Sequence, residues 1–173
     1  MRFSYPDELV HEKIGPGKAV TCGAVMLWDA SREGNNERGS QLLDLGVDID
    51  SMCNMMPPII AATEACQFET IKLLVDRGCK IDALNEYDGT TALCLAALCD
   101  EPEICLFLIS RGADATIADY QGYSALANYG MFASEDEPSA GVMSNAARIK
   151  SAWEQRIQCV SAGGNEPKAN VPL

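Results

Sequence analysis

Histidine is nearly absent from this sequence, and positive charge is scarce. His11 is the only histidine, and no nucleophile lies near it in the chain. A catalytic or metal-binding histidine needs oriented partners, so we expect no histidine-based catalytic site, no His-rich metal site and no enzyme. Thirteen Lys and Arg face 25 Asp and Glu, which leaves a net charge of −12. Such a chain repels nucleic-acid phosphates, so we expect no nucleic-acid partner.

Long hydrophobic runs and phosphate-binding loops are also missing. The apolar stretches are only a few residues long, whereas a helix that crosses a bilayer needs about 20. Residues 1–7 carry no apolar segment of the kind that a secretory signal has. The sequence GPGK at 15–18 lacks the spacing of a nucleotide-binding loop and is typical of a turn. We therefore expect a soluble protein of the cytoplasm, with the nucleus as the alternative, and no membrane partner.

Eight cysteines are present, but no two of them form a C-x-x-C pair. In a chain without a secretory address they are expected to be free thiols rather than disulfides. Cys94 and Cys105 fall at apolar positions and are interpreted as small hydrophobic side chains. Cys66 and Cys99 leave an alternative open, in which the chain is a cysteine-based redox sensor or a metal-binding protein. The leading interpretation has no cofactor and no metal.

The sequence does contain an internal repeat. The segment that starts at Gly89, GTTALCLAALCDEPEICLFLISRGAD, is followed at Gly122, 33 residues later, by GYSALANYG. The segment that starts at Pro57, PPIIAATEACQFETIKLLVDRGCK, matches the one from Thr91 at an offset of 34, and a weaker copy opens at Leu27. Repeats of this length indicate stacked units, each of which buries little apolar surface alone.

These residues resemble the ankyrin repeat. The resemblance runs from about residue 22 to 133, and its matching stretches are Gly89-Thr90-Thr91-Ala92-Leu93 with Ala96-Ala97, and Arg111-Gly112-Ala113-Asp114 with Asp119, Gly122, Ser124, Ala125 and Leu126. It implies an all-α solenoid of about four stacked helix-turn-helix units with hairpin-like loops and degenerate terminal caps. The first helix of each unit is then sandwiched between its neighbours, which explains why TALCLAAL has almost no polar face.

The repeat sets the expected boundaries. We expect an N-terminal arm over 1–20, a repeat domain over 21–160 and a disordered tail over 161–173. The expected units are about 22–54, 55–87, 88–120 and 121–160, the last with an acidic insertion at 133–143. From caps and glycines, first helices are expected near 58–65, 92–99 and 125–132, second helices near 37–45, 69–77 and 103–111, and a capping helix at 144–160.

Two departures from the ankyrin pattern concern the backbone. The glycine between the two helices of a unit is kept as Gly34 but replaced by Cys66 and Asp100 in the next copies. A left-handed residue with a Cβ costs about 1 kcal/mol, so strain is expected at Cys66. The histidine of the TPLH motif is also lost, which removes hydrogen bonds worth about 1 kcal/mol each. Its place is taken by Trp28, Ile60, Cys94 and Ala127.

The resemblance also implies a face that binds partners. Ankyrin proteins typically bind along a concave surface made by the hairpin tips and the exposed edge of the first helices. Carried over to this chain, those positions give the candidate partner-binding residues Met55, Met56, Glu64, Tyr87, Asp88, Thr90, Leu98, Cys99, Tyr120, Gln121, Tyr123, Met131 and Phe132. Three of the five tyrosines and three of the seven methionines fall in this set. Both residue types supply large, adaptable contact area.

The expected function is a non-enzymatic protein–protein interaction module that acts as an adaptor, scaffold or inhibitor. The expected partner is a protein segment that is neutral or basic, because the surroundings of the face are acidic. We expect a monomer, with weak self-association through the tyrosine face as the alternative. The run Glu135-Asp136-Glu137 in the insertion is expected to be a solvated loop rather than a calcium site.

Overall fold

The structure is a computed structural model that describes residues 16–126 and 145–161. Within these residues it is all-helical, and its only extended pairings are three isolated bridges in loops. The helices are α1 (Pro16–Glu33), α2 (Asn36–Asp44), α3 (Pro58–Glu64), α4 (Phe68–Asp76), α5 (Ala92–Leu98), α6 (Pro102–Ser110) and α8 (Asn145–Ser161). The predicted all-α solenoid of helix pairs is confirmed.

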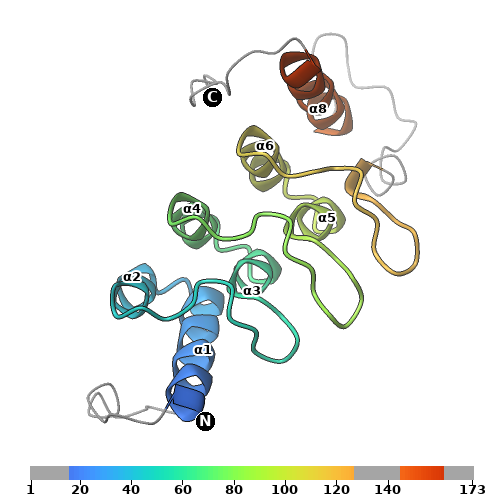
Figure 1. The fold of residues 1–173 in the computed structure, drawn as a ribbon. Helices are drawn as coiled ribbons and strands as arrows, with labels where there is room; N and C mark the ends of the chain where they lie inside the picture. The colour runs from blue at the N-terminus through green and yellow to red at the C-terminus, as the bar shows by residue number, and fades with distance from the viewer. Residues whose placement is uncertain (1–15, 127–144, 162–173) are drawn as a thin grey trace.

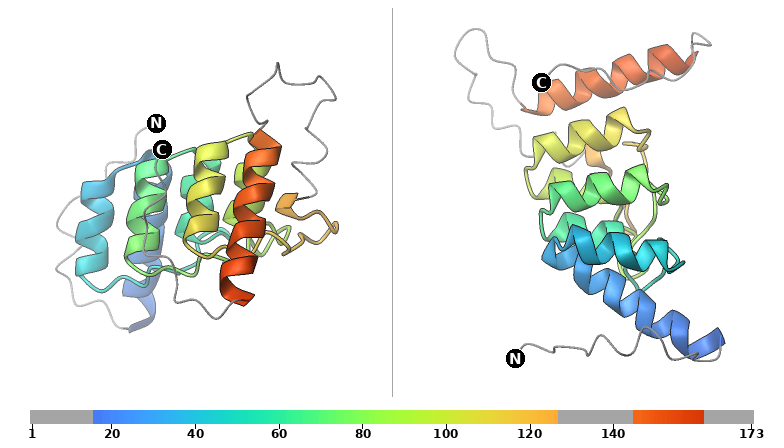
Figure 2. Two further views of the ribbon diagram at one scale, coloured as in Figure 1. Left: turned by 90° about the horizontal axis from the view of Figure 1, so that it is seen from above. Right: turned by 90° about the vertical axis from the view of Figure 1, so that its left-hand side faces the viewer.

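The helices form two rows (Figure 1). The first helices, α1, α3 and α5, stand side by side, and the second helices, α2, α4 and α6, form a parallel row next to them, on the left in this view. The loops that lead into α3, into α5 and to Ala125 project beyond the first row. Figure 2 shows the helices stacked between α1 at one end and α8 at the other.

Helix α5 shows why a first helix needs little polar face. Thr91 caps it, since its hydroxyl accepts a hydrogen bond from the Cys94 N–H at 3.1 Å. The helix then buries Ala92, Leu93, Cys94, Ala96 and Ala97 between its neighbours. The small side chains allow the adjacent helices to approach closely. The interpretation of TALCLAAL as a sandwiched helix is therefore confirmed.

The second helices hold the units together through their outer surface. The Phe68 and Phe107 rings meet edge to face with centroids 5.6 Å apart. Arg111 pairs with Asp76 of the preceding unit at 2.7 Å and lies over the Phe107 ring, 5.0 Å from its centroid. These groups are partly exposed to solvent, so each ion pair contributes at most about 1 kcal/mol. Most of the stabilisation comes from the buried apolar side chains between the two rows.

Helices α2 to α6 lie within one residue of their predicted limits. The expected left-handed turns are present as well, with φ of 73° at Gly34, 53° at Cys66 and 54° at Asp100. The N-terminal boundary differs, because α1 begins at Pro16, inside the range 1–20 that was expected to be an arm. A terminal helix packs on one side only, so the repeat pattern does not limit its length.

At the other end, α8 closes the stack against α6. Ile149 is buried there, and the Arg156 guanidinium donates to the Ile109 carbonyl at 3.2 Å. The chain is helical at Ala125 and Leu126, where the first helix of the last unit was expected. The rest of that helix, the insertion at 133–143 and the tail beyond 161 lie outside the described residues. Among the residues that are described, no helix has the length and hydrophobicity needed to cross a bilayer.

Candidate functional site

Three hairpin tips project from the row of first helices. We define them as residues 48–57, 82–91 and 114–124. Each is closed by one antiparallel bridge, formed by Cys53 with Met56, Leu84 with Thr91, and Ala118 with Ser124. Side-chain oxygens also fold each tip back on itself. Asn85 Oδ1 accepts from the Tyr87 N–H at 3.0 Å, and Asp119 Oδ1 accepts from the Gln121 and Tyr123 N–H groups at 2.9 Å.

Backbone hydrogen bonds join neighbouring tips. The Glu86 N–H donates to the Met55 carbonyl, and the Tyr120 N–H donates to the Asp88 carbonyl, both at 2.9 Å. Gly89, at φ 78°, supports the second of these contacts because a Cβ there would collide with the Tyr120 ring. The three tips therefore form one connected surface rather than three independent loops.

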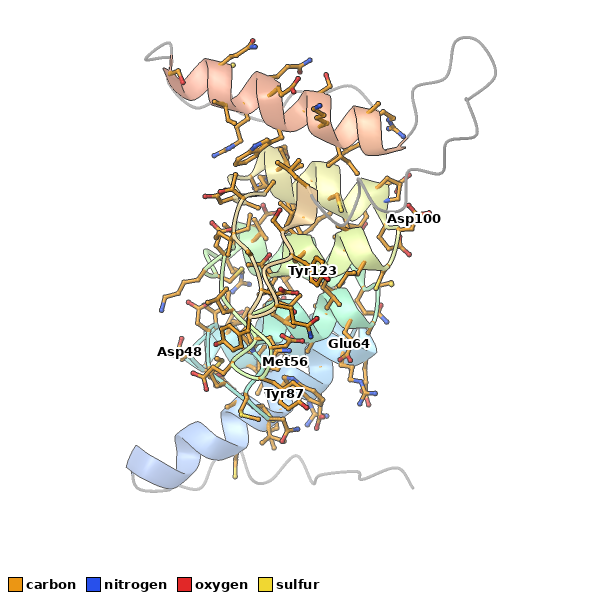
Figure 3. The ribbon with its side chains drawn as sticks, turned by 90° about the vertical axis from the view of Figure 1, so that its right-hand side faces the viewer. Asp48, Met56, Glu64, Tyr87, Asp100 and Tyr123 are labelled. Atoms are coloured by element: carbon orange, nitrogen blue, oxygen red, sulfur yellow. The ribbon has the colours of Figure 1, made fainter. Side chains whose placement is uncertain are left out.

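The three tyrosines of the tips point into solvent. Tyr87 is 77% exposed, Tyr120 68% and Tyr123 43%. In Figure 3, Met56, Tyr87 and Tyr123 lie between Asp48 at one edge and Glu64 and Asp100 at the other. An aromatic surface with acidic edges thus runs along the tips.

The first tip is a tight two-residue turn with an unusual backbone. Asn54 and Met55 both have positive φ, 51° and 62°, and the Cys53 and Met56 backbones exchange two hydrogen bonds. Such turns favour Asn followed by Gly, so Met55 is strained. Its side chain is half exposed. The sequence resemblance missed Met52 and Leu84, which are also exposed here; only their places in the hairpins reveal them.

The helix edge contributes a smaller part of the site. Glu64, Leu98 and Cys99 lie at helix ends and are exposed. Among the remaining predicted residues of the tips, Gln121 is exposed, while Met56 and Asp88 are half-buried. Thr90 differs from its prediction because it is only 5% exposed. Its N–H donates to Asp88 Oδ1 and its carbonyl accepts from the Asn85 N–H, so Thr90 shapes the tip from within. Met131 and Phe132 lie outside the described residues.

Cys94 occupies the position of the TPLH histidine, and its thiol makes hydrogen bonds that were not expected from the sequence. Its thiol lies 3.4 Å from the Tyr123 carbonyl and 4.0 Å from the Ile117 carbonyl, and donates to both. The loss of the histidine therefore leaves a weaker bond between this helix and the next tip. Burial, together with the charges of Asp119 and Asp88, raises the pKa of the Cys94 thiol to about 11.

The exposed thiols at the helix ends are poorly suited to redox chemistry. Burial and the charge of Glu101 raise the pKa of Cys66 and of Cys99, which lowers their thiolate fractions. In the described part of the chain, no three or more His, Cys, Asp and Glu side chains are grouped so that they could hold a metal ion.

The stacked helix pairs and their linked tips define a helical repeat protein. The chain belongs to the ankyrin-repeat family, because residues 27–119 match the family described as "Ankyrin repeats (3 copies)". It is also similar to the "Ankyrin repeat domain-containing protein oryK" of Aspergillus oryzae, with 42% identity over 55 residues. That match covers 32% of this chain and 9% of the relative, so the chain spans a small part of the relative's length. Ankyrin repeats are generally protein–protein interaction modules.

Proposed function

We propose that this chain is a non-enzymatic adaptor, scaffold or inhibitor that holds a segment of a partner protein across its hairpin tips. The observation that carries the proposal is the exposure of Tyr87, Tyr120 and Tyr123 on one connected surface. Tyrosine supplies a broad apolar ring and a polar tip at a low entropic cost, which suits a recognition surface.

The distribution of exposed apolar side chains supports this location. Nine large hydrophobic residues are exposed in the described part of the chain, and six of them belong to the tips: Met52, Met55, Leu84, Tyr87, Tyr120 and Tyr123. Contiguous apolar surface of this kind costs solubility unless a partner covers it. The strained Met55 adds to the argument, because strain in an exposed loop is commonly retained for function.

The test is an affinity pull-down with the intact chain, followed by binding measurements on the partner it isolates. Replacement of Tyr87, Tyr120 and Tyr123 by Ala should weaken binding by about 1 to 3 kcal/mol for each central anchor. Leu45 and Ile157 are exposed outside the tips. Their double Ala variant is the control and should bind as the wild type does. If the triple tyrosine variant keeps full affinity, the binding face lies elsewhere.

A further inference from the structure

Charge is distributed very unevenly over the hairpin tips. Residues 48–57, 82–91 and 114–124 contain no Lys, Arg or His. They contain seven acidic residues: Asp48, Asp50, Asp82, Glu86, Asp88, Asp114 and Asp119. The surface that carries the exposed tyrosines therefore has no cation of its own.

Several cations of the described residues are engaged away from the tips. The three ion pairs formed within these residues join Lys72 to Glu69, Arg77 to Asp44 and Arg111 to Asp76, all on the side of the second helices. Three rings outside the tips have cations over them: Arg32 lies over Trp28, Lys72 over Phe68 and Arg111 over Phe107. Within the described part of the chain, no such contact is made to a tip tyrosine.

Asp88 of the second tip is linked through its backbone to Tyr120 of the third tip, whose ring is largely exposed. The Tyr120 N–H binds the Asp88 carbonyl, and the Tyr120 ring covers the adjacent Gly89. Asp88 uses Oδ1 to accept from the Thr90 N–H. The pKa of the thiol beneath, Cys94, is raised in part by Asp88 and Asp119, which indicates negative potential between the second and third tips. A ring face together with a carboxylate attracts a Lys or Arg side chain through two additive interactions.

The spacing of the tips restricts the conformation of the bound segment. Tyr87 and Tyr120 lie 33 residues apart, one repeat, and packed helices are separated by about 8–10 Å. A polyproline II segment advances about 3.1 Å per residue with three residues per turn, so every third side chain recurs on one face after about 9 Å. Cations three residues apart in such a segment match successive tips.

We propose that the partner segment is a cationic polyproline II strand with Lys or Arg at every third position, whose cations lie on Tyr87 and Tyr120 beside Glu86 and Asp88. This inference rests on the proposed function and specifies its partner. The second and third tips each supply an exposed ring and carboxylates one repeat apart, and the strand supplies cations at the same spacing.

The test uses fluorescent synthetic peptides and the intact chain. The first peptide is proline-rich with Arg at every third position, the second has the same composition with its Arg residues consecutive, and the third has Gln in place of Arg. Anisotropy titrations should give an affinity for the first peptide about tenfold above that for the second. The third peptide should not bind measurably. Equal affinities for the first two peptides would overturn the proposal, because non-specific attraction to an acidic chain ignores spacing.

Matched variants distinguish the effect of the tip carboxylates on binding from the effect of the net charge of the chain. Glu86→Gln with Asp88→Asn removes two charges from the tips, and Asn retains the acceptor for the Thr90 N–H. The control, Glu103→Gln with Glu154→Gln, removes two exposed charges from α6 and α8. The tip variant should lose the preference for the spaced peptide, and the control should keep it. Equal loss in both variants would contradict the proposal.

Two further outcomes distinguish this inference from the proposed function. A natural partner that is lost by the triple tyrosine variant but unaffected by the tip-charge variant would leave the proposed function standing and overturn the cationic strand. Sedimentation of the intact chain tests whether a second copy of the chain, rather than a peptide, covers the tips. A dimer that the tyrosine substitutions dissociate, and that excludes the peptides, would make a second copy the occupant and would also overturn this proposal.

Discussion

At the scale of single residues, the hairpin tips combine strained backbone with weak but well-placed hydrogen bonds. Met55 has a positive φ, and its carbonyl accepts the bond that aligns the second tip. Cys94 lies beneath the third tip and donates to the Tyr123 carbonyl. Each residue thus links local geometry to the position of a tyrosine.

Replacement of Met55 by Gly should raise stability and lower partner affinity. Glycine relieves the left-handed strain in this turn and should raise the free energy of unfolding by up to about 1 kcal/mol. The same change removes a half-exposed side chain of the candidate site. Met55→Ala is the matched control, because it removes the contact but keeps the strain. Urea titration and a binding assay would refute the prediction if Met55→Gly is no more stable than Met55→Ala.

The Cys94 thiol should make the protein less stable at alkaline pH. Its pKa is raised from 9.0 to about 11 in the folded state. From pH 9 to 11 the unfolded chain loses this proton while the folded chain retains it, so rising pH favours unfolding. The stabilisation is complete below pH 9 and is lost as the pH rises through 11, with a slope of up to about 1.4 kcal/mol per pH unit.

Urea unfolding between pH 8 and 11 provides the measurement. Cys94→Ala should reduce the slope over this range, although a partly buried thiol, Cys79, retains its own contribution because its pKa is raised to about 12. Cys22→Ala removes an exposed thiol and serves as the control. Identical slopes in the wild type and Cys94→Ala would contradict the assignment.

At the scale of elements, the stack depends on small side chains between first helices. Ala96 is fully buried in α5, which packs against α3 and α6. Ala96→Leu should therefore lower the free energy of unfolding by about 1 to 3 kcal/mol, because the larger side chain forces the helices apart. Leu98→Ala, at the exposed end of the same helix, should change stability by less than about 0.5 kcal/mol. Chemical denaturation that ranks these two variants in the opposite order would contradict the packing.

The interior helices were predictable from the sequence because several local signals agree. Thr91, Pro102 and Gly112 mark the limits of α5 and α6, and the same period recurs one unit earlier. The start of α1 was not predictable in this way, because the residues around Pro16 have no repeated copy with which they can be compared. The turn at Asn54 and Met55 was also missed, since Met gives no signal for a left-handed residue.

The candidate site was predictable in part, for a related reason. The ankyrin register placed Tyr87, Tyr120 and Tyr123 on the tips because it fixes their distance from the glycines. It misjudged Thr90, whose burial depends on hydrogen bonds to Asp88 and Asn85 that a register does not show. Exposure within a loop depends on how that loop folds back, and the repeat period does not specify this.

At the scale of the whole molecule, excess negative charge should affect stability and binding in opposite ways when salt is added. The chain carries a net charge of −12, and self-repulsion destabilises the compact state. The ion pairs on the second helices are partly exposed, so screening them costs little. Salt shortens the Debye length from about 30 Å at 0.01 M to about 3 Å at 1 M. The midpoint of thermal unfolding should therefore rise as salt is added.

Affinity for a cationic segment should fall over the same range of salt, because the carboxylates of the tips are screened from the strand. Glu86→Gln with Asp88→Asn should make binding less dependent on salt, while its unfolding midpoint should still rise as in the wild type. Differential scanning fluorimetry and anisotropy, both run from low to high NaCl, measure the two responses on the same samples. An unfolding midpoint that falls with salt would show that attractive pairs outweigh the repulsion. Affinity that is independent of salt would show that the tyrosines bind through apolar contact alone.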